Sequence, residues 1–118
     1  MQQVQIYGLT KCDTCRKARA WLDGHGVAYR FIDYREHPVP PRTLYAWAAA
    51  LGGWEKLVNR ASMTWRGLAP ERKSPQTREQ WLALIAEFPA LIRRPVLSAP
   101  GQDVLAGFSD KKYGEIFK

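Results

Sequence analysis

The first 34 residues read as strand, helix, strand, and this pattern constrains the fold of the chain most strongly. Residues 4–8 begin with alternating apolar and polar side chains, as a half-buried strand does. Residues 12–22 place apolar side chains at helical spacing, and residues 27–34 are rich in β-branched and aromatic residues, which favour strands. Two strands joined in this way by a helix predict a βαβ unit, with parallel strands and a right-handed crossover.

The middle of the chain, about residues 41–90, reads as a helical insert. Gly52-Gly53 ends one predicted helix, and a capping box formed by Thr77 and Gln80 predicts the start of another. The segments after the insert predict a β-hairpin and a closing helix: strand 95–98, strand 103–108 and helix 109–117. The predicted order is therefore βαβ, helical insert, ββα, in one α/β domain that spans residues 1–118.

Cys12 and Cys15 are the two cysteines of the chain, and they lie where the first strand gives way to the first helix. The unpaired N–H groups at the start of a helix favour negative charge, and Lys11, Arg16 and Lys17 add positive charge nearby. A lowered thiol pKa raises the fraction of reactive thiolate. We therefore expect Cys12 to be the attacking thiol. Cys15 lies one helical turn further on, on the apolar side, and is expected to be the resolving thiol.

Two other interpretations of the cysteine pair exist: a structural pair of buried thiols, or half of a zinc site. A zinc site needs two further ligands, and only His25 and His37 could supply imidazole. His25 lies between two glycines at a predicted helix end, and His37 lies in a proline-rich loop without a motif around it. We therefore expect thiol chemistry and no metal.

The chain has a formal net charge of +7, but its basic residues are scattered and no long run of them occurs. An acidic partner, an anionic substrate and nucleic acid are all compatible with this charge, and the scatter leads us to expect no direct nucleic-acid binding. No stretch approaches the roughly 18 apolar residues of a membrane span, and the first residues do not resemble a secretion signal. With a closely spaced cysteine pair, these features predict a protein of the reducing cytoplasm.

Arg94 and Pro95 form the second candidate cluster. A proline that opens a strand often follows a sharp turn, sometimes with a cis peptide bond. In a βαβ–ββα fold that turn can face the start of the first helix, where Arg94 would bind an oxyanion or a carboxylate beside Cys12. A solvated arginine at a strand end is the alternative. Arg60 and Arg66 lie in the insert, and the sequence leaves open whether either reaches the site.

Six segments, in order along nearly the whole chain, match one known family: residues 7–18 with the Cys12–Cys15 motif, 29–34, 57–61, 64–66, 92–97 and 107–109. On these segments the chain resembles the ArsC/Spx family of thioredoxin-like proteins, and within it most closely the YffB-type subgroup. The resemblance implies a thioredoxin-like α/β fold with a four-stranded mixed sheet and a helical insert between its halves.

The resemblance also implies roles for individual residues. The reactive cysteine of the family matches Cys12, and the family's cis proline, which faces that cysteine, matches Pro95. Arg94 and Arg60 match two of the three arginines that surround the cysteine in the glutaredoxin-linked arsenate reductases. Gly107 stands where the third arginine is expected. We therefore expect poor arsenate binding, because a tetrahedral oxyanion needs several charge-assisted donors.

The predicted function is that of a thiol-disulfide oxidoreductase, with glutathione as co-substrate and no tightly bound cofactor. Its predicted partners are glutathione or another small thiol or disulfide, and glutaredoxin is a further candidate. The resemblance leaves one alternative open. Members of the Spx branch are transcription regulators that sense oxidation through a CxxC motif and bind the RNA polymerase alpha subunit. Cys12 and Cys15 match that motif.

Overall fold

The computed structural model describes residues 3–117, which divide into two units. The sheet unit consists of the residues up to His37 together with those from Arg94 onward, and the helical unit is Pro38–Arg93. The sheet unit contains the βαβ and ββα segments that the sequence predicts. The helical unit corresponds to the predicted insert, which we placed at about residues 41–90.

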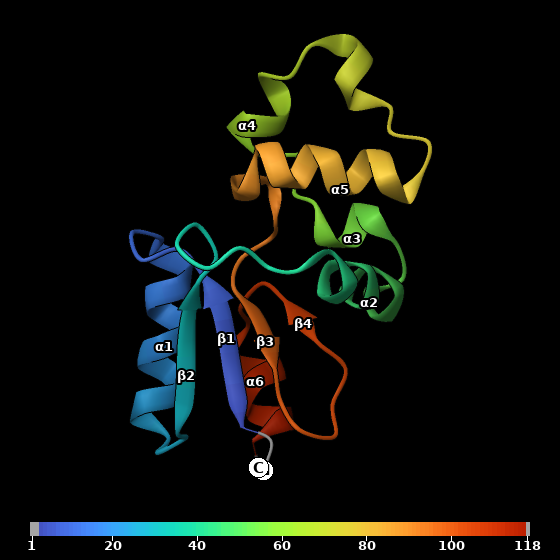
Figure 1. The fold of residues 1–118 in the computed structure, drawn as a ribbon. Helices are drawn as coiled ribbons and strands as arrows, with labels where there is room; N and C mark the ends of the chain where they lie inside the picture. The colour runs from blue at the N-terminus through green and yellow to red at the C-terminus, as the bar shows by residue number, and fades with distance from the viewer. Residues whose placement is uncertain (1–2, 118) are drawn as a thin grey trace. The chain divides into compact units, whose positions relative to one another are not determined.

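A four-stranded mixed sheet forms the centre of the sheet unit, as Figure 1 shows. Strand β1 (Val4–Gly8) pairs in parallel with β2 (Tyr29–Asp33) and antiparallel with β3 (Val96–Ser98), and β3 pairs antiparallel with β4 (Leu105–Ala106). The order across the sheet is β2-β1-β3-β4. The predicted mixed sheet, with parallel strands in the βαβ unit, is confirmed.

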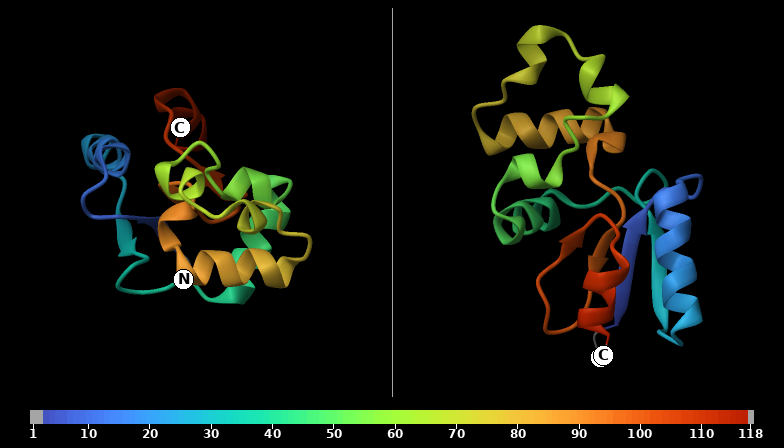
Figure 2. Two further views of the ribbon diagram at one scale, coloured as in Figure 1. Left: turned by 90° about the horizontal axis from the view of Figure 1, so that it is seen from above. Right: turned by 180° about the vertical axis from the view of Figure 1, so that it is seen from behind.

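Helices α1 (Asp13–Gly24) and α6 (Asp110–Ile116) cover the same face of this sheet, which is visible in the right view of Figure 2. The core between helices and sheet is apolar and consists of Ile6, Ala18, Leu22, Leu97 and Tyr113. Burial of one such large side chain is worth about 1.5–3 kcal/mol. This packing holds the N-terminal end of α1 in a fixed place beside the end of β1.

The helical unit has its own core. Its helices are α2 (Pro41–Leu51), α3 (Trp54–Leu57), α4 (Met63–Arg66) and α5 (Arg78–Glu87), with short 3-10 turns η1 (Pro70–Lys73) and η2 (Pro89–Leu91). Thr77 and Gln80 form the predicted capping box of α5. Trp81 of α5 stacks on Trp54 and on Trp65, with ring centroids 6.2 and 6.0 Å apart.

Within residues 3–117, none of the helices combines the length and apolar content that crossing a membrane requires.

The last strand is shorter than predicted. We expected a strand over 103–108, whereas β4 covers Leu105–Ala106. Gly107 ends it because its φ of +86° lies in the left-handed region, outside the extended conformation of a strand. Its N–H still donates a hydrogen bond of 2.8 Å to the carbonyl of Pro95, so the turn after β4 stays attached to β3.

Candidate active site

Cys12 occupies the N-cap position of α1. Its backbone is extended there, with φ −104° and ψ 123°, and its carbonyl accepts the first helical hydrogen bond, from the N–H of Arg16 at 3.0 Å. The Cys12 N–H donates to the carbonyl of Leu9 at 3.3 Å, which closes the turn between β1 and α1. Its side chain is partly exposed, so the thiol lies at a helix N-terminus and remains accessible.

The surroundings of Cys12 favour its thiolate. Partial burial by itself raises the pKa of the Cys12 thiol. Interactions with the N–H and the thiol of Cys15, and with the guanidinium of Arg94, outweigh that effect and hold the pKa below its ordinary value. The stabilisation of its charged form therefore comes chiefly from Cys15 and Arg94.

Cys15 has the opposite character. It is 1% exposed, and this burial raises the pKa of its thiol to about 12, although the N–H of Leu9 favours its charged form. The thiol of Cys15 donates toward the sulfur of Cys12, and the negative charge of Cys12 raises the pKa of Cys15 further. Both cysteines are free thiols. The expected position of Cys15 on the apolar side of the helix is confirmed.

Gly8 provides the space that Cys15 occupies. A Cβ atom at Gly8 would lie 2.5 Å from the sulfur of Cys15, closer than any real contact allows. Gly8 is the last residue of β1, opposite Asp33 in the parallel register. A glycine is therefore required at this position as long as Cys15 packs against the end of the strand.

Arg94 connects Cys12 to a buried tyrosine. Its guanidinium interacts with the sulfur of Cys12 and with the hydroxyl of Tyr34. Burial raises the pKa of Tyr34 to about 12, although Arg94 acts in the opposite direction. For Arg94 itself, burial disfavours the charged form, but contacts with Tyr34 and Cys12 outweigh this and raise its pKa. The peptide bond from Arg94 to Pro95 is cis, as the resemblance implied.

A surface pocket of 620 Å³ adjoins Cys12 within the sheet unit. Its charged side chains have both signs, and its lining consists of Leu9, Thr10, Lys11, Cys12, Asp33, Arg35, Glu36 and Arg94. Asp33 accepts hydrogen bonds from the N–H and the hydroxyl of Thr10 at 3.1 and 2.7 Å, and from the N–H of Arg35 at 2.9 Å. The small burial of Asp33 raises its pKa, but these hydrogen bonds have the larger combined effect and lower it.

The structure brings four of the five predicted site residues into one region of the sheet unit: Cys12, Cys15, Arg94 and Pro95. The fifth, Arg60, is an exposed residue of the helical unit, and its role stays a prediction. Among residues 3–117, no cluster of three or more histidine, cysteine or acidic side chains is arranged to hold a metal ion.

Sequence reasoning missed Tyr34, Asp33, Arg35 and Glu36. A signal for them exists in the predicted fold, because ligands of such sheets bind beyond the carboxyl ends of parallel strands. Strands β1 and β2 are parallel and in register up to Gly8 and Asp33, so the residues that follow each strand meet at one edge. The segment after β1 contains Cys12, and the segment after β2 contributes the other side of the pocket.

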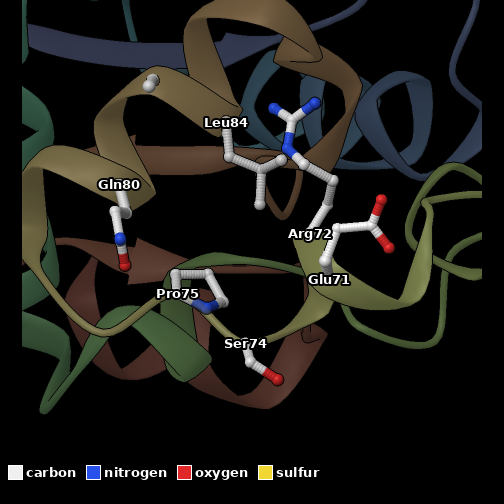
Figure 3. A pocket seen from close by; sticks show the side chains of 7 residues that line it. Glu71, Arg72, Ser74, Pro75, Gln80 and Leu84 are labelled. Carbon is white, nitrogen blue, oxygen red and sulfur yellow. The ribbon is translucent and has the colours of Figure 1, made fainter.

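A second pocket, of 220 Å³, lies in the helical unit and is shown in Figure 3. Two of its polar side chains have partners within the fold. Arg72 pairs with Glu87 at 2.9 Å, and Gln80 accepts hydrogen bonds at the start of α5. The pocket is lined without any thiol. It therefore offers no counterpart to the chemistry around Cys12.

A mixed sheet of this topology, with a partly exposed thiol at the N-cap of its first helix, defines a thioredoxin-like thiol protein. The sequence pattern of the ArsC family matches residues 7–116, and the chain belongs to that family. Among solved structures, one named as YFFB protein is 38% identical with a TM-score of 0.87, over 95% of this chain and 96% of that one. An arsenate reductase (ArsC) related protein from Brucella melitensis is 36% identical with a TM-score of 0.75, over 99% of this chain and 96% of the other.

A transcription regulator is also among the relatives. The global transcriptional regulator Spx 1 of Lactococcus lactis subsp. lactis is 30% identical over 96 residues, which are 80% of this chain and 74% of that protein. The thioredoxin-like fold and the ArsC family membership expected from the sequence are thus confirmed. The relatives include both arsenate reductase-like proteins and regulators.

Proposed function

We propose that the protein is a thiol-disulfide oxidoreductase in which Cys12 is the nucleophile. The observation that carries this proposal is the environment of the Cys12 sulfur, which lies at a helix N-terminus between the donors of Cys15 and the guanidinium of Arg94. A thiolate held in this way attacks one sulfur of a disulfide. A bond then forms between the Cys12 sulfur and that sulfur, the original S–S bond breaks, and the other sulfur leaves as a thiolate.

The resolving step has two candidate thiols, Cys15 and glutathione. The thiol of Cys15 already lies against the Cys12 sulfur, which supports an internal disulfide between them. Glutathione is a peptide with two carboxylates and one ammonium group. The pocket beside Cys12 offers Lys11, Arg35 and Arg94 for the carboxylates, and Asp33 and Glu36 for the ammonium group. This mixed charge supports glutathione as the co-substrate.

Arg94 and Pro95 complete the proposed site in the sheet unit. Arg94 keeps Cys12 ionised and binds a carboxylate of the substrate. Pro95 shapes the turn that presents Arg94. Arg60 is assigned to substrate binding through the family resemblance alone. Glutaredoxin is a candidate electron donor or acceptor for the same thiols.

The test uses the reduced protein and its Cys12→Ser and Cys15→Ser variants. Iodoacetamide should label the parent and Cys15→Ser rapidly below neutral pH, and label Cys12→Ser at least tenfold more slowly, because the remaining thiol is buried and that burial raises its pKa. Reaction with oxidised glutathione, followed by mass spectrometry, should add glutathione to Cys15→Ser at Cys12. Equal labelling of the parent and Cys12→Ser would overturn the assignment of the nucleophile.

A second candidate function is that of a redox-sensing regulator that binds the RNA polymerase alpha subunit. The CxxC pair and the 30% identity with an Spx regulator favour it. A pull-down with purified alpha subunit, using the reduced and the oxidised protein, separates the two functions. Binding that depends on the redox state, without turnover of disulfides, would favour the regulator. Turnover of glutathione-linked disulfides without binding would favour the enzyme.

A further inference from the structure

The hydroxyl of Tyr113 is a buried polar group to which the proposed mechanism gives no role. Tyr113 lies in α6, its side chain is fully buried, and among residues 3–117 its hydroxyl has no hydrogen-bond partner. A buried hydroxyl without a partner destabilises a fold, whereas phenylalanine would fill the same space without that cost. Such a group therefore suggests a role in another state of the protein.

The position of Tyr113 relates it to the resolving thiol. It belongs to the same buried core cluster as Ala18 and Leu22, which lie on the same buried face of α1 as Cys15, one and two helical turns away. Helices α1 and α6 cover the same face of the sheet (Figure 2). Burial raises the pKa of the Tyr113 hydroxyl, and the electrostatic interaction with Cys15 raises it further.

The environment of Cys15 changes when Cys12 becomes part of a mixed disulfide. In the dithiol form, the thiol of Cys15 donates toward the Cys12 thiolate, and that negative charge opposes the ionisation of Cys15. Formation of the mixed disulfide removes both effects. The N–H of Leu9 and the positive charge of Arg94 remain, and both favour a Cys15 thiolate. The hydroxyls of Tyr34 and Tyr113 also interact electrostatically with Cys15.

We propose that the Tyr113 hydroxyl donates a hydrogen bond to the Cys15 sulfur as it ionises and attacks Cys12, and that Tyr113 is thereby a positioning residue for disulfide closure. This inference rests on the proposed function. In the closing step, a bond forms between the sulfurs of Cys15 and Cys12, and the bond from Cys12 to the substrate sulfur breaks. The substrate sulfur leaves as a thiolate, and the proton lost by Cys15 passes to solvent. The protein is oxidised by two electrons and the substrate disulfide is reduced.

The experiment follows the reaction of the reduced protein with 5,5′-dithiobis(2-nitrobenzoate). Attack by Cys12 releases one thionitrobenzoate, and closure by Cys15 releases the second, so the two steps appear as separate phases. In Tyr113→Phe the first phase should be unchanged. Loss of a hydrogen bond to a charged sulfur lowers the thiolate population about tenfold. Because a more basic thiolate is also the better nucleophile, the second phase should slow about threefold at pH values below the pKa of Cys15.

The pH profile separates this effect from a change in packing. The slowing should diminish as the pH approaches the pKa of Cys15 in the mixed disulfide, because the thiolate population then stops limiting the rate. A packing defect would slow the second phase equally at every pH. The free energy of unfolding of dithiol Tyr113→Phe should be no lower than that of the parent, since the hydroxyl has no partner in that form.

Tyr29→Phe is the matched control, because it removes a partly buried hydroxyl of β2 that interacts with Arg19 at 3.4 Å. Both of its phases should match those of the parent. The inference is overturned if Tyr113→Phe closes as fast as the parent, if it slows equally at all pH values, or if the parent shows a first phase without a second. Absence of the first phase in the parent would instead refute the proposed role of Cys12.

Discussion

Replacement of Arg94 by alanine tests the electrostatics of the site most directly. Its guanidinium is half-buried and interacts with both the Cys12 sulfur and the Tyr34 hydroxyl. Arg94→Ala removes a hydrogen-bond donor and a positive charge from the Cys12 thiolate and leaves the interactions with Cys15 in place. The pKa of Cys12 should therefore rise, since the remaining partial burial favours the neutral thiol.

The size of the effect follows from the kind of contact that is lost. Hydrogen bonds to charged groups contribute about 1.5–3 kcal/mol, and the partial exposure of Cys12 to water argues for the lower end of that range. A loss of about 1.4 kcal/mol lowers the thiolate population tenfold at pH values below the pKa. The higher basicity of the remaining thiolate compensates in part, so the rate of attack on a disulfide should fall about threefold to fourfold.

The assay is a titration of thiolate absorbance against pH, together with the rate of iodoacetamide labelling near neutral pH. Arg93→Ala is the matched control. Arg93 is the exposed neighbouring arginine, and its backbone N–H, which the substitution retains, donates to the carbonyl of Leu57 at 2.8 Å. The control should leave the pKa of Cys12 unchanged. If Arg94→Ala also leaves it unchanged, the reasoning from the Arg94 contact is wrong.

Three further predictions concern glycines and a carboxylate. Gly8→Ala should destabilise the protein by about 1–3 kcal/mol in urea unfolding, because the added Cβ would lie 2.5 Å from the Cys15 sulfur. Gly24→Ala is the control and should be tolerated, because a Cβ at Gly24 meets no atom within 4 Å. Asp33→Asn should lower the free energy of unfolding near pH 7 by less than about 1 kcal/mol, because the pKa of Asp33 is lowered in the fold. That contribution exists above the unfolded pKa of about 3.9 and is lost as the pH falls through the lower folded pKa, so the difference in unfolding should shrink as the pH falls below about 3.9. Arsenate reduction, measured through the oxidation of glutathione, should be slow. The arginine missing at Gly107 costs a contact of about 1.5–3 kcal/mol, which is about ten- to a hundredfold in affinity for arsenate. Rapid turnover of arsenate would contradict this prediction.

Patterns along the chain were sufficient to predict the element order and the place of Cys12 at the start of the first helix. Apolar periodicity distinguishes β1 and β2 from α1, and the capping box at Thr77 marks the start of α5. These are local signals, since each depends on residues within a few positions of one another. The position of Cys12 at the start of α1 follows from the same local pattern.

The contacts that tune the site depend on residues far apart in the sequence. Tyr34 meets Arg94 because β2 and β3 flank β1 in the sheet, and neither residue has a neighbouring pattern that indicates the contact. The extent of β4 was overestimated because composition does not reveal that Gly107 adopts φ +86°. The unpartnered hydroxyl of Tyr113 is likewise invisible in the sequence, where a tyrosine in an amphipathic helix simply predicts core packing.

The burial of Cys15 does not disqualify it as the resolving thiol. In the dithiol form its pKa of about 12 leaves it ionised in about one molecule in 10⁵ at pH 7, against about 3% for an external thiol of pKa about 8.5, and loss of the Cys12 charge in the mixed disulfide can only raise that fraction. Its greater basicity makes the thiolate about 40-fold more nucleophilic, which leaves a deficit of about a hundredfold. Against an external thiol at about 1 mM, closure by Cys15 is therefore the faster reaction once the effective concentration of Cys15 exceeds about 0.1 M. Well-oriented groups reach effective concentrations of about 10⁵ M or more. Because its thiol already lies against the Cys12 sulfur, closure should precede attack by glutathione, which then reduces the internal disulfide rather than the first mixed disulfide.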